Sequence, residues 1–533
     1  MKRKYTAAVI LFAGQLSEAA LENAFDGRCA FSLALKKAAS FPEALKITVL
    51  AANDFDETLL PRGIDSIELV REASWNTKNF LQALSKAGEG FGLSYFAWAD
   101  CPFLDPHLAG TLAERHLRGA AEYSYADGWP SGLAPEILAP GTAGMLSFIN
   151  GDTEASVDRD MIFNVLQKDI NAFDIETEIS PVDLRQHRLT LAARSKRDLL
   201  LLRRLWDEGI ASAPSAADFV GQIIAEKPAL LRTLPAFYPI QAVSACPQRC
   251  QLCPYPQSPR FVSAAPGAEL SENCWLKPDD FSLLLDKIAG FSDDAVIDLS
   301  LWGELALHPQ KMELVKAVLR RPSLSLVIET SGIGWKRADF ETLAGEAAAC
   351  APRKNGMAAL SWIVSLDTSG EAGNERGDGF GAAVEAARSV ISLFPRDGYV
   401  QAVRVKGNEE SIERFYRFWK AEGANVIIQK YDSFCGFLPP RSAADLSPVR
   451  RGPCWHLMRD MPVLLDGSVP VCRAASVLQP GGEAVSADTV LGNAFSEGLD
   501  EIWQRGEALY ARHCAGAYDG PCSRCDEYYT FNF

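Results

Sequence analysis

Short apolar runs alternate with longer amphipathic stretches along most of the chain. Near the amino terminus, the runs at 6–14, 44–52 and 92–100 predict buried strands, and the apolar period of 105–120 predicts a helix. Alternating strands and helices predict an α/β layer built around a largely parallel sheet. Ligands of such sheets bind beyond the carboxyl ends of the strands, and Asp100 stands at one of these ends.

The middle of the chain alternates more regularly. Helix-like stretches at 279–291, 310–321 and 409–423 lie between apolar runs. We expect strands in six of these runs, at 237–245, 295–302, 324–332, 359–367, 398–406 and 424–431. Six βα units predict an incomplete TIM-type barrel, with its reactive groups at the carboxyl ends of the strands.

Proline-bearing linkers and a change in composition divide the chain into three expected domains. Residues 1–235 form the first α/β domain, and residues 236–445 form the partial barrel. Residues 446–533 form a small domain that contains five of the thirteen cysteines. The predicted fold class is therefore α/β, with a cysteine-rich carboxyl-terminal domain.

Composition excludes several classes of function. A net charge of −15 argues against broad binding to nucleic acid or to anionic membranes. No apolar stretch approaches the roughly 18 residues of a membrane helix, and the apolar run near the amino terminus lacks a small-residue cleavage pattern. Clustered cysteines are unlike a secreted disulfide framework, so we expect a cytoplasmic protein without a membrane partner.

Three cysteines, Cys246, Cys250 and Cys253, stand within eight positions directly after the first barrel strand. Three thiols are one too few for a closed tetrahedral zinc site, and odd for disulfides. Thiolates also hold iron–sulfur clusters, and a cubane held by three of them keeps one iron open. The CxxxCxxC spacing resembles that of the radical S-adenosylmethionine (SAM) enzymes, in which SAM completes this iron. A chance trio of buried or zinc-binding cysteines is the alternative.

Further residues resemble motifs of the same family at successive strand ends. The stretch 301–309 is similar to the GGE motif, with Trp302 in place of its first glycine. The resemblance implies SAM contacts from the residues Gly303, Glu304, Ser331, Ser365, Asp367 and Arg404. The alternative for each is a turn glycine, a helix cap or a surface ion pair.

The last segment carries a second cysteine pattern. Cys454 and Cys472 flank Gly467, and a CxxC pair follows at Cys522 and Cys525. This pattern resembles the SPASM/Twitch extensions of radical SAM enzymes, and five cysteines fit the shorter Twitch type with one auxiliary [4Fe-4S] cluster. The resemblance implies the four ligands just named. Three more cysteines remain open as ligands, Cys514 as a reserve, Cys435 and Cys274. A four-cysteine zinc ribbon is the alternative.

The chain as a whole resembles the spiro-SPASM proteins, which join a radical SAM barrel to a nucleotidyltransferase-like domain. The stretch 95–116 is similar to cytidylyltransferases and related GT-A folds, which implies Mg²⁺ at Asp100. However, the glycine-rich phosphate loop of these enzymes is missing, since only Gly14 and Arg28 are left of it. A degenerate domain kept for binding or assembly and an active nucleotidyltransferase both remain open.

The resemblance implies a radical SAM enzyme. Flavodoxin or ferredoxin would reduce the cluster on the barrel cysteines, and cleavage of SAM would yield a 5′-deoxyadenosyl radical that takes hydrogen from the substrate. A peptide, a nucleotide-linked molecule or a carbohydrate is the expected substrate. Two rival functions are an iron–sulfur electron carrier or scaffold without turnover, and a nucleotidyltransferase with an accessory metal domain.

Overall fold

The computed structural model describes residues 5–61, 63–64, 67–366, 380–477 and 489–527. The chain separates into two compact units, Met1–Leu230 and Leu231–Phe533. Each unit has its own sheet and its own core. The predicted barrel and the predicted cysteine-rich segment both lie within the second unit. The boundaries of the three expected domains stay a prediction.

The first unit is built on a seven-stranded sheet with the order β3-β2-β1-β4-β6-β5-β7. All of its pairs are parallel except those of β6, which is antiparallel to β4 and to β5. The strands are β1 (Ala7–Ala13), β2 (Ala44–Ala52), β3 (Ile67–Glu72), β4 (Leu93–Trp98), β5 (Tyr123–Asp127), β6 (Glu136–Leu138) and β7 (Ile175–Ile179). The strands expected at 6–14, 44–52 and 92–100 are confirmed.

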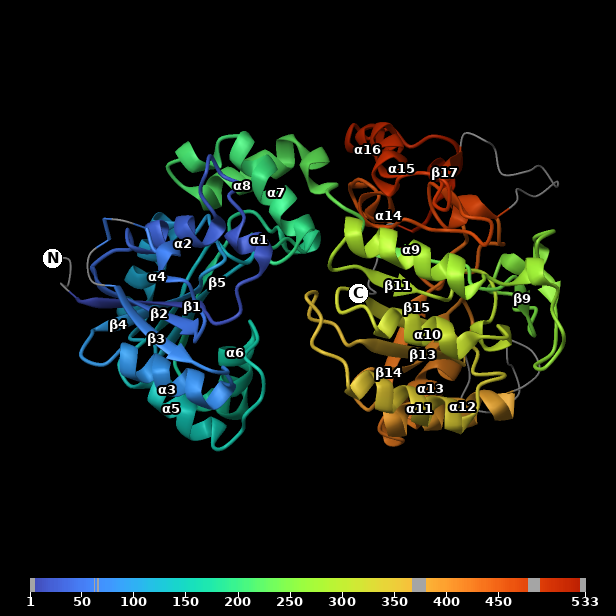
Figure 1. The fold of residues 1–533 in the computed structure, drawn as a ribbon, viewed down its shortest axis with the longest axis horizontal. Coiled ribbons are helices and arrows are strands. Elements are labelled where there is room, and N and C mark those ends of the chain that lie inside the picture. Colours follow the sequence, from blue (N-terminus) through green and yellow to red (C-terminus); the bar gives the residue numbers. More distant parts are fainter. Residues whose placement is uncertain (1–4, 62, 65–66, 367–379, 478–488, 528–533) are drawn as a thin grey trace. The chain divides into compact units, whose positions relative to one another are not determined.

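Helices cover both faces of this sheet, because its central strands are apolar on both sides (Figure 1). Helices α2 (Ala30–Ala38) and α4 (Pro106–Gly119) pack on one face. Helices α3 (Thr77–Ala87), α5 (Thr142–Asn150) and α6 (Met161–Leu166) pack on the other. The remaining helices are α1 (Glu18–Leu21), α7 (Lys196–Asp207) and α8 (Ala216–Glu226).

The second unit contains a six-stranded parallel sheet with the sequential order β8-β11-β12-β13-β14-β15. Its strands are β8 (Phe237–Pro239), β11 (Val296–Asp298), β12 (Ser325–Thr330), β13 (Leu360–Ser365), β14 (Gly398–Arg404) and β15 (Asn425–Lys430). The six expected strands are confirmed, with a helix between each consecutive pair. The first expected strand, 237–245, is broken. Its last residue belongs to a separate short pair, β9 (Ala245–Cys246) with β10 (Val262–Ser263).

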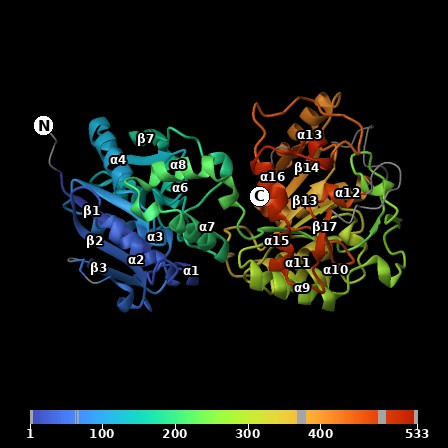
Figure 2. The ribbon, with the colours of Figure 1, turned by 90° about the horizontal axis from the view of Figure 1, so that it is seen from above.

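Helices pack around the outside of this sheet (Figures 1 and 2). They are α9 (Pro278–Phe291), α10 (Lys311–Leu319), α11 (Arg337–Ala348), α12 (Phe380–Leu393) and α13 (Glu409–Ala421). The main core lies between them and the strands, around Trp362 and Trp419, which are both fully buried. No helix in the described part of the chain is long and apolar enough to span a membrane.

The cysteine-rich segment packs against the β8 side of the sheet. Bridges from Asp460 and Val463 extend the sheet past β8, and Lys287 of α9 donates to the carbonyl oxygens of Ala494 and Phe495. Its elements are α14 (Trp455–Arg459), β16 (Ser468–Pro470), β17 (Val490–Asn493), α15 (Leu499–Arg505) and α16 (Glu507–Cys514). The anchoring places its cysteines near the carboxyl ends of the barrel strands.

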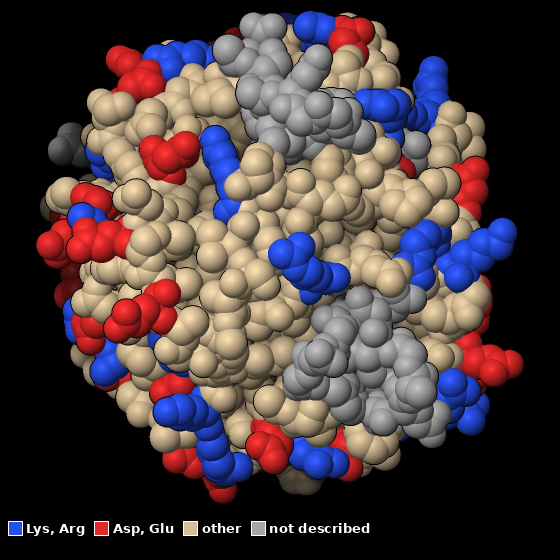
Figure 3. Space-filling view, turned by 90° about the vertical axis from the view of Figure 1, so that its right-hand side faces the viewer, with Lys and Arg blue, Asp and Glu red and all other residues tan. Residues whose placement is uncertain are grey.

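Charged side chains of both signs are scattered over the face of the second unit that Figure 3 shows. They surround a broad area of uncharged residues, and the described part of this face has no continuous basic patch. A patch of that kind would be expected for electrostatic binding of a nucleic acid backbone.

Candidate functional site

The three clustered cysteines line one cavity of about 220 Å³ at the carboxyl ends of the barrel strands. The loop that carries them starts at β9 and turns back at Cys250, whose carbonyl oxygen accepts from the amide of Cys253 at 3.3 Å. Several residues from the strand ends, and one from the cysteine-rich segment, line the same cavity. They are Gly303, Glu304, Glu329, Thr330, Ser331, Ser365, Gln401, Lys430, Asp432 and Arg473.

Stacked rings hold the cysteine loop in place. The ring of Tyr255 lies 5.8 Å from that of Trp302, nearly parallel to it, and its hydroxyl donates to the carbonyl oxygen of Ser244. The amide nitrogen of Gln241 donates to the Tyr255 hydroxyl and to the Trp302 carbonyl oxygen. Trp302, which replaces the first glycine of the GGE pattern, therefore supports the loop through its ring.

Glu304 ties the cysteine loop to the end of β12. Its amide donates to the carbonyl oxygen of Ala245 at 2.9 Å. Its carboxylate accepts from the Thr330 hydroxyl at 2.6 Å, and from the Ser331 amide and hydroxyl at 2.8 and 2.7 Å. Burial, and then this carboxylate, raise the pKa of the neighbouring Cys246 thiol. The side chain is only 4% exposed, so these contacts fix its position.

Gly303 allows this close approach. Its φ is +134°, and a Cβ at this position would lie 2.0 Å from the carbonyl oxygen of Val243. Any side chain would therefore push the segment that carries Glu304 away from the cysteine loop. Glycine is required here by both backbone angle and space.

A layer of polar side chains from the barrel strands lies next to the Glu304 contacts. Ser365 and Gln401 both donate to one carboxylate oxygen of Glu329, at 2.7 and 2.9 Å. The buried carbonyl oxygen of Gln401 has no hydrogen-bond partner among the described residues. Burial, with a smaller contribution from Glu329, raises the pKa of Asp298 to about 7. The layer is rich in acceptors and would take a hydroxyl or amino donor from a ligand.

Arg404 does not join the cysteines, in contrast to the position that the resemblance implies. Side chains alternate along β14, and Gln401 and Val403 face the cysteine cavity, so Arg404 points to the other side. There it lines a second cavity of about 480 Å³ with Lys406 and Lys430. Asp367, the other expected residue of this set, lies outside the described residues.

The carboxyl-terminal cysteines surround a separate cavity of about 210 Å³. Cys454, Cys472, Cys522 and Cys525 all line it, as their spacing implies. Burial is the main cause that raises the pKa of the Cys472 thiol, to about 12. No three His, Cys, Asp or Glu side chains in the described ranges are arranged to hold a single metal ion.

Cys435 lines the same cavity and was left open by the sequence, because it lies 19 residues before Cys454. The one signal for it is its place just past the last barrel strand, near the strand ends. Cys514 and Cys274 do not line this cavity. The Cys274 thiol instead lies 3.1 Å from the hydroxyl of Ser271.

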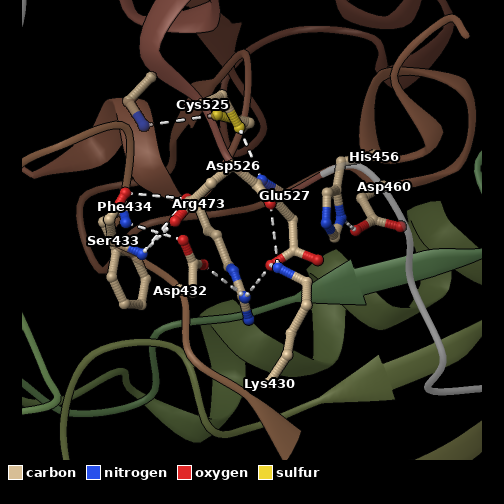
Figure 4. A network of polar contacts seen from close by, with 12 residues as sticks. Lys430, Asp432, Ser433, Phe434, His456, Asp460, Arg473, Cys525, Asp526 and Glu527 are labelled. Carbon is tan, nitrogen blue, oxygen red and sulfur yellow. Dashed lines mark hydrogen bonds and ion pairs between the residues drawn. The ribbon is translucent and has the colours of Figure 1, made fainter. Parts of the chain in front are cut away.

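Charged residues connect the two cysteine cavities (Figure 4). Asp432 and Arg473 line both, and their side chains are 3.0 Å apart. Glu527 lies 3.9 Å from Arg473 and 3.1 Å from Lys430. Burial is the main cause that raises the pKa of Glu527, and the two cations act against it. The cations are compensated by carboxylates, so the connection is a neutralised network.

In the first unit, Asp100 is buried and forms an ion pair with Arg159, whose guanidinium lies over the ring of Trp98. This partner lies 59 residues away in sequence, and only the fold reveals it. The pairing engages one oxygen of the carboxylate that the resemblance implies for Mg²⁺. The magnesium site stays a prediction.

Comparison with protein families assigns the second cysteine segment. Residues 454–526 match the SPASM model, described as an iron–sulfur cluster-binding domain. The match covers this segment of the chain alone. The chain belongs to the same family as a protein of Treponema pallidum (strain Nichols) described only as "Uncharacterized protein". The two are 37% identical over 382 residues, which are 70% of this chain and 98% of that protein.

Comparison with solved structures finds similarity to parts of the chain. BtrN in complex with AdoMet and 2-DOIA is 15% identical, with a TM-score of 0.34 over 55% of this chain and 93% of its own. Streptococcus suis SuiB bound to S-adenosylmethionine is 14% identical, with a TM-score of 0.39 over 56% and 72%. A cytidylyltransferase from Leptospira borgpetersenii is 14% identical, with a TM-score of 0.34 over 42% and 95%. Similarity at this level does not assign an activity.

The geometry of Gly303 makes a direct prediction for stability. We expect Gly303→Ala to lower the free energy of unfolding of the second unit by about 1–3 kcal/mol, because the new Cβ meets the Val243 carbonyl at a left-handed backbone angle. Gly345→Ala, within α11 and with open space around it, is the matched control and should stabilise by roughly 0.5–1 kcal/mol. Urea unfolding followed by circular dichroism measures both. Equal effects of the two substitutions would contradict the packing described here.

Proposed function

We propose that this protein is a radical SAM enzyme whose barrel cysteines hold a [4Fe-4S] cluster. The observation that supports this best is the convergence of Cys246, Cys250 and Cys253 with Glu304 in one cavity at the carboxyl ends of parallel strands. The three thiols fit a cubane with one open iron. The SPASM match, on a separate segment whose thiols line their own cavity, supports an iron–sulfur protein independently.

The cluster with SAM, once reduced by a donor such as flavodoxin or ferredoxin, supplies a carbon-centred radical that takes hydrogen from a substrate. The protein's part is to bind, orient and exclude water. Glu304, already fixed by Thr330 and Ser331, faces the cavity with the cysteines and would accept from an N–H of the SAM amino group. Gly303 would let the backbone approach SAM closely, while Asp367 stays a prediction for the same ligand.

Ser365 and Gln401 would orient a hydroxyl or amino group of SAM or of the substrate. Gln401 keeps its amide nitrogen on Glu329, and its buried carbonyl oxygen, which has no partner among the described residues, is left as an acceptor beside the cavity. A carbohydrate, a nucleotide-linked molecule and a peptide all carry such donors. Arg404 is better placed to meet an anionic part of the substrate, because it lines the neighbouring cavity with Lys406 and Lys430.

The second cavity would hold an auxiliary [4Fe-4S] cluster on Cys454, Cys472, Cys522 and Cys525. These four thiols supply the complete set that a cubane takes, without an open iron. The charged network of Asp432 and Arg473, which reaches both cavities, would keep substrate and auxiliary cluster near each other. The auxiliary site would accept an electron from the substrate radical or bind the substrate directly.

Cleavage of SAM tests the proposed activity. Anaerobically reconstituted protein with dithionite should form 5′-deoxyadenosine, measured by liquid chromatography and mass spectrometry. Cys250→Ala should reduce the product at least a hundredfold, because the barrel cluster loses one of its three ligands. Cys350→Ala, a half-buried cysteine outside both cysteine cavities, is the matched control and should keep the wild-type rate. Product from Cys250→Ala at the control's rate would exclude this assignment.

Iron content distinguishes the two sites. The wild type should hold about eight irons if each cluster is a cubane, and the variant with all three barrel cysteines changed to alanine about four. The remaining cluster should show no change in its electron paramagnetic resonance (EPR) spectrum when SAM is added, because all its irons are ligated. A colourless variant that contains zinc would support a zinc ribbon in its place.

The pairing of Asp100 with Arg159 predicts that the first unit does not transfer nucleotides. Wild-type protein with CTP and Mg²⁺ should release no pyrophosphate above a heat-inactivated control. Asp100→Asn, which keeps a hydrogen-bond acceptor for Arg159, should leave SAM cleavage unchanged. Robust Mg²⁺-dependent release of pyrophosphate that Asp100→Asn abolishes would instead support the nucleotidyltransferase.

A further inference from the structure

The auxiliary cavity contains one more thiol than a cubane takes. Cys435 is 8% exposed, lines the cavity with the other four cysteines, and forms a hydrogen bond with the thiol of Cys525. Electrostatic interactions also link the Cys435 thiol to that of Cys472. The Cys522 thiol interacts in the same way with Cys525 and Cys472. Cys435 and Cys522 thus line one cavity within electrostatic range of the same pair of thiols.

The backbone around Cys435 is held in an unfavourable conformation. Phe434 and Cys435 have φ values of 51° and 59°, and Gly436 follows at 76°. Left-handed backbone is unfavourable for a residue other than glycine. A cysteine that only filled space in a core would not need such a turn. The turn does bring the thiol to the cavity.

Asp526 holds this turn in place (Figure 4). Its carboxylate accepts from the Ser433 hydroxyl at 2.8 Å and from the Ser433 amide at 3.3 Å. The Ser433 hydroxyl oxygen in turn accepts from the amide of Gly436 at 3.1 Å. Asp526 directly follows Cys525, so one residue fixes the turn of Cys435 beside a proposed cluster ligand. This carboxylate is a positioning group.

We propose that Cys435 is an alternative fourth ligand of the auxiliary site, so that Cys454, Cys472 and Cys525 hold the cluster and either Cys435 or Cys522 completes it. This inference rests on the auxiliary cluster of the proposed function. It assigns a metal-binding role to a cysteine outside the SPASM segment 454–526. The site would therefore tolerate the loss of either of these two thiols, but not of both.

The experiment uses the full chain with the three barrel cysteines changed to alanine, in which only the auxiliary site can hold iron. Iron per chain and the EPR spectrum after reduction are measured. Cys435→Ser and Cys522→Ser, each alone, should keep about four irons, and Cys522→Ser should show shifted g-values because a different thiol completes the cluster. The double variant should lose most of its iron. Cys454→Ser should lose most of its iron as a single substitution, because no other thiol can replace Cys454 as a ligand.

Two controls separate ligation from folding. Cys514→Ser combined with Cys522→Ser should keep about four irons, because Cys514 does not line the cavity. As a single substitution, Asp526→Ala should keep about four irons. Combined with Cys522→Ser it should lose its iron, because the turn at residues 433–436 is no longer held and Cys435 no longer reaches the cluster. Circular dichroism of every variant should match that of its parent.

Each result of this experiment either supports or overturns the role proposed for Cys435. Loss of iron from Cys522→Ser alone would overturn the inference, since Cys435 would not have replaced it. Loss from Cys435→Ser alone, or retention of four irons in the double variant, would overturn it too. In all of these cases the parent holds iron, so the proposed auxiliary cluster stands. A parent without any iron would overturn the auxiliary cluster and this inference together.

Discussion

The buried carboxylate of Glu304 is the contact on which the barrel site depends. Its amide is bonded to Ala245, directly before the first cysteine, and its carboxylate accepts from the end of β12. A carboxylate that is 4% exposed would be costly without partners, and Thr330 and Ser331 supply three. The cysteine loop therefore has a fixed position relative to the strand ends before any cofactor binds. Gly303 is the condition for this contact, because no other residue fits so close to Val243.

The two cysteine cavities share residues, which relates the two halves of the proposed chemistry. Asp432 follows the last barrel strand and Arg473 follows Cys472, and their ion pair lies at the wall of both cavities. Removal of Arg473 would leave the carboxylate of Asp432, whose side chain is 13% exposed, without this cation, which is destabilising. The network thus fixes the auxiliary segment on the barrel. Because the cations of this network are paired with carboxylates, the wall between the two cavities offers hydrogen-bond acceptors rather than an open pocket for anions.

Much of the fold follows from the sequence because its signals are local. The strand expected at 324–332 is found at Ser325–Thr330, and the helix expected at 279–291 is found at Pro278–Phe291. The three barrel thiols also converge, since their spacing places them on one short segment, residues 246–253. The break after β8 was not expected, because Ile240 and Gln241 bond to Asp298 and Val463, which are distant in sequence.

The rest of the site depends on contacts between distant residues. The pairs Asp100–Arg159 and Cys435–Cys525 join segments whose separation in sequence carries no signal. Arg404 is a different case. The alternation of side chains along β14 could be predicted from the sequence. Gln401 and Val403 face the cysteine cavity, so Arg404 faces the other side of the sheet. The position of Arg404 in the motif indicated a SAM contact. The alternation of side chains along the strand predicted better which side of the sheet Arg404 faces.

The central proposal is that Cys246, Cys250 and Cys253 would hold an iron–sulfur cluster with one open iron, and that this iron would bind the amino group of SAM. Electron–nuclear double resonance of the reduced wild-type protein, with SAM labelled with ¹⁵N at its amino group, measures this contact directly. The account predicts a resolved ¹⁵N coupling to the barrel cluster that is absent from the variant without the three barrel cysteines. A reduced cluster on Cys246, Cys250 and Cys253 that shows no ¹⁵N coupling at saturating SAM would contradict it.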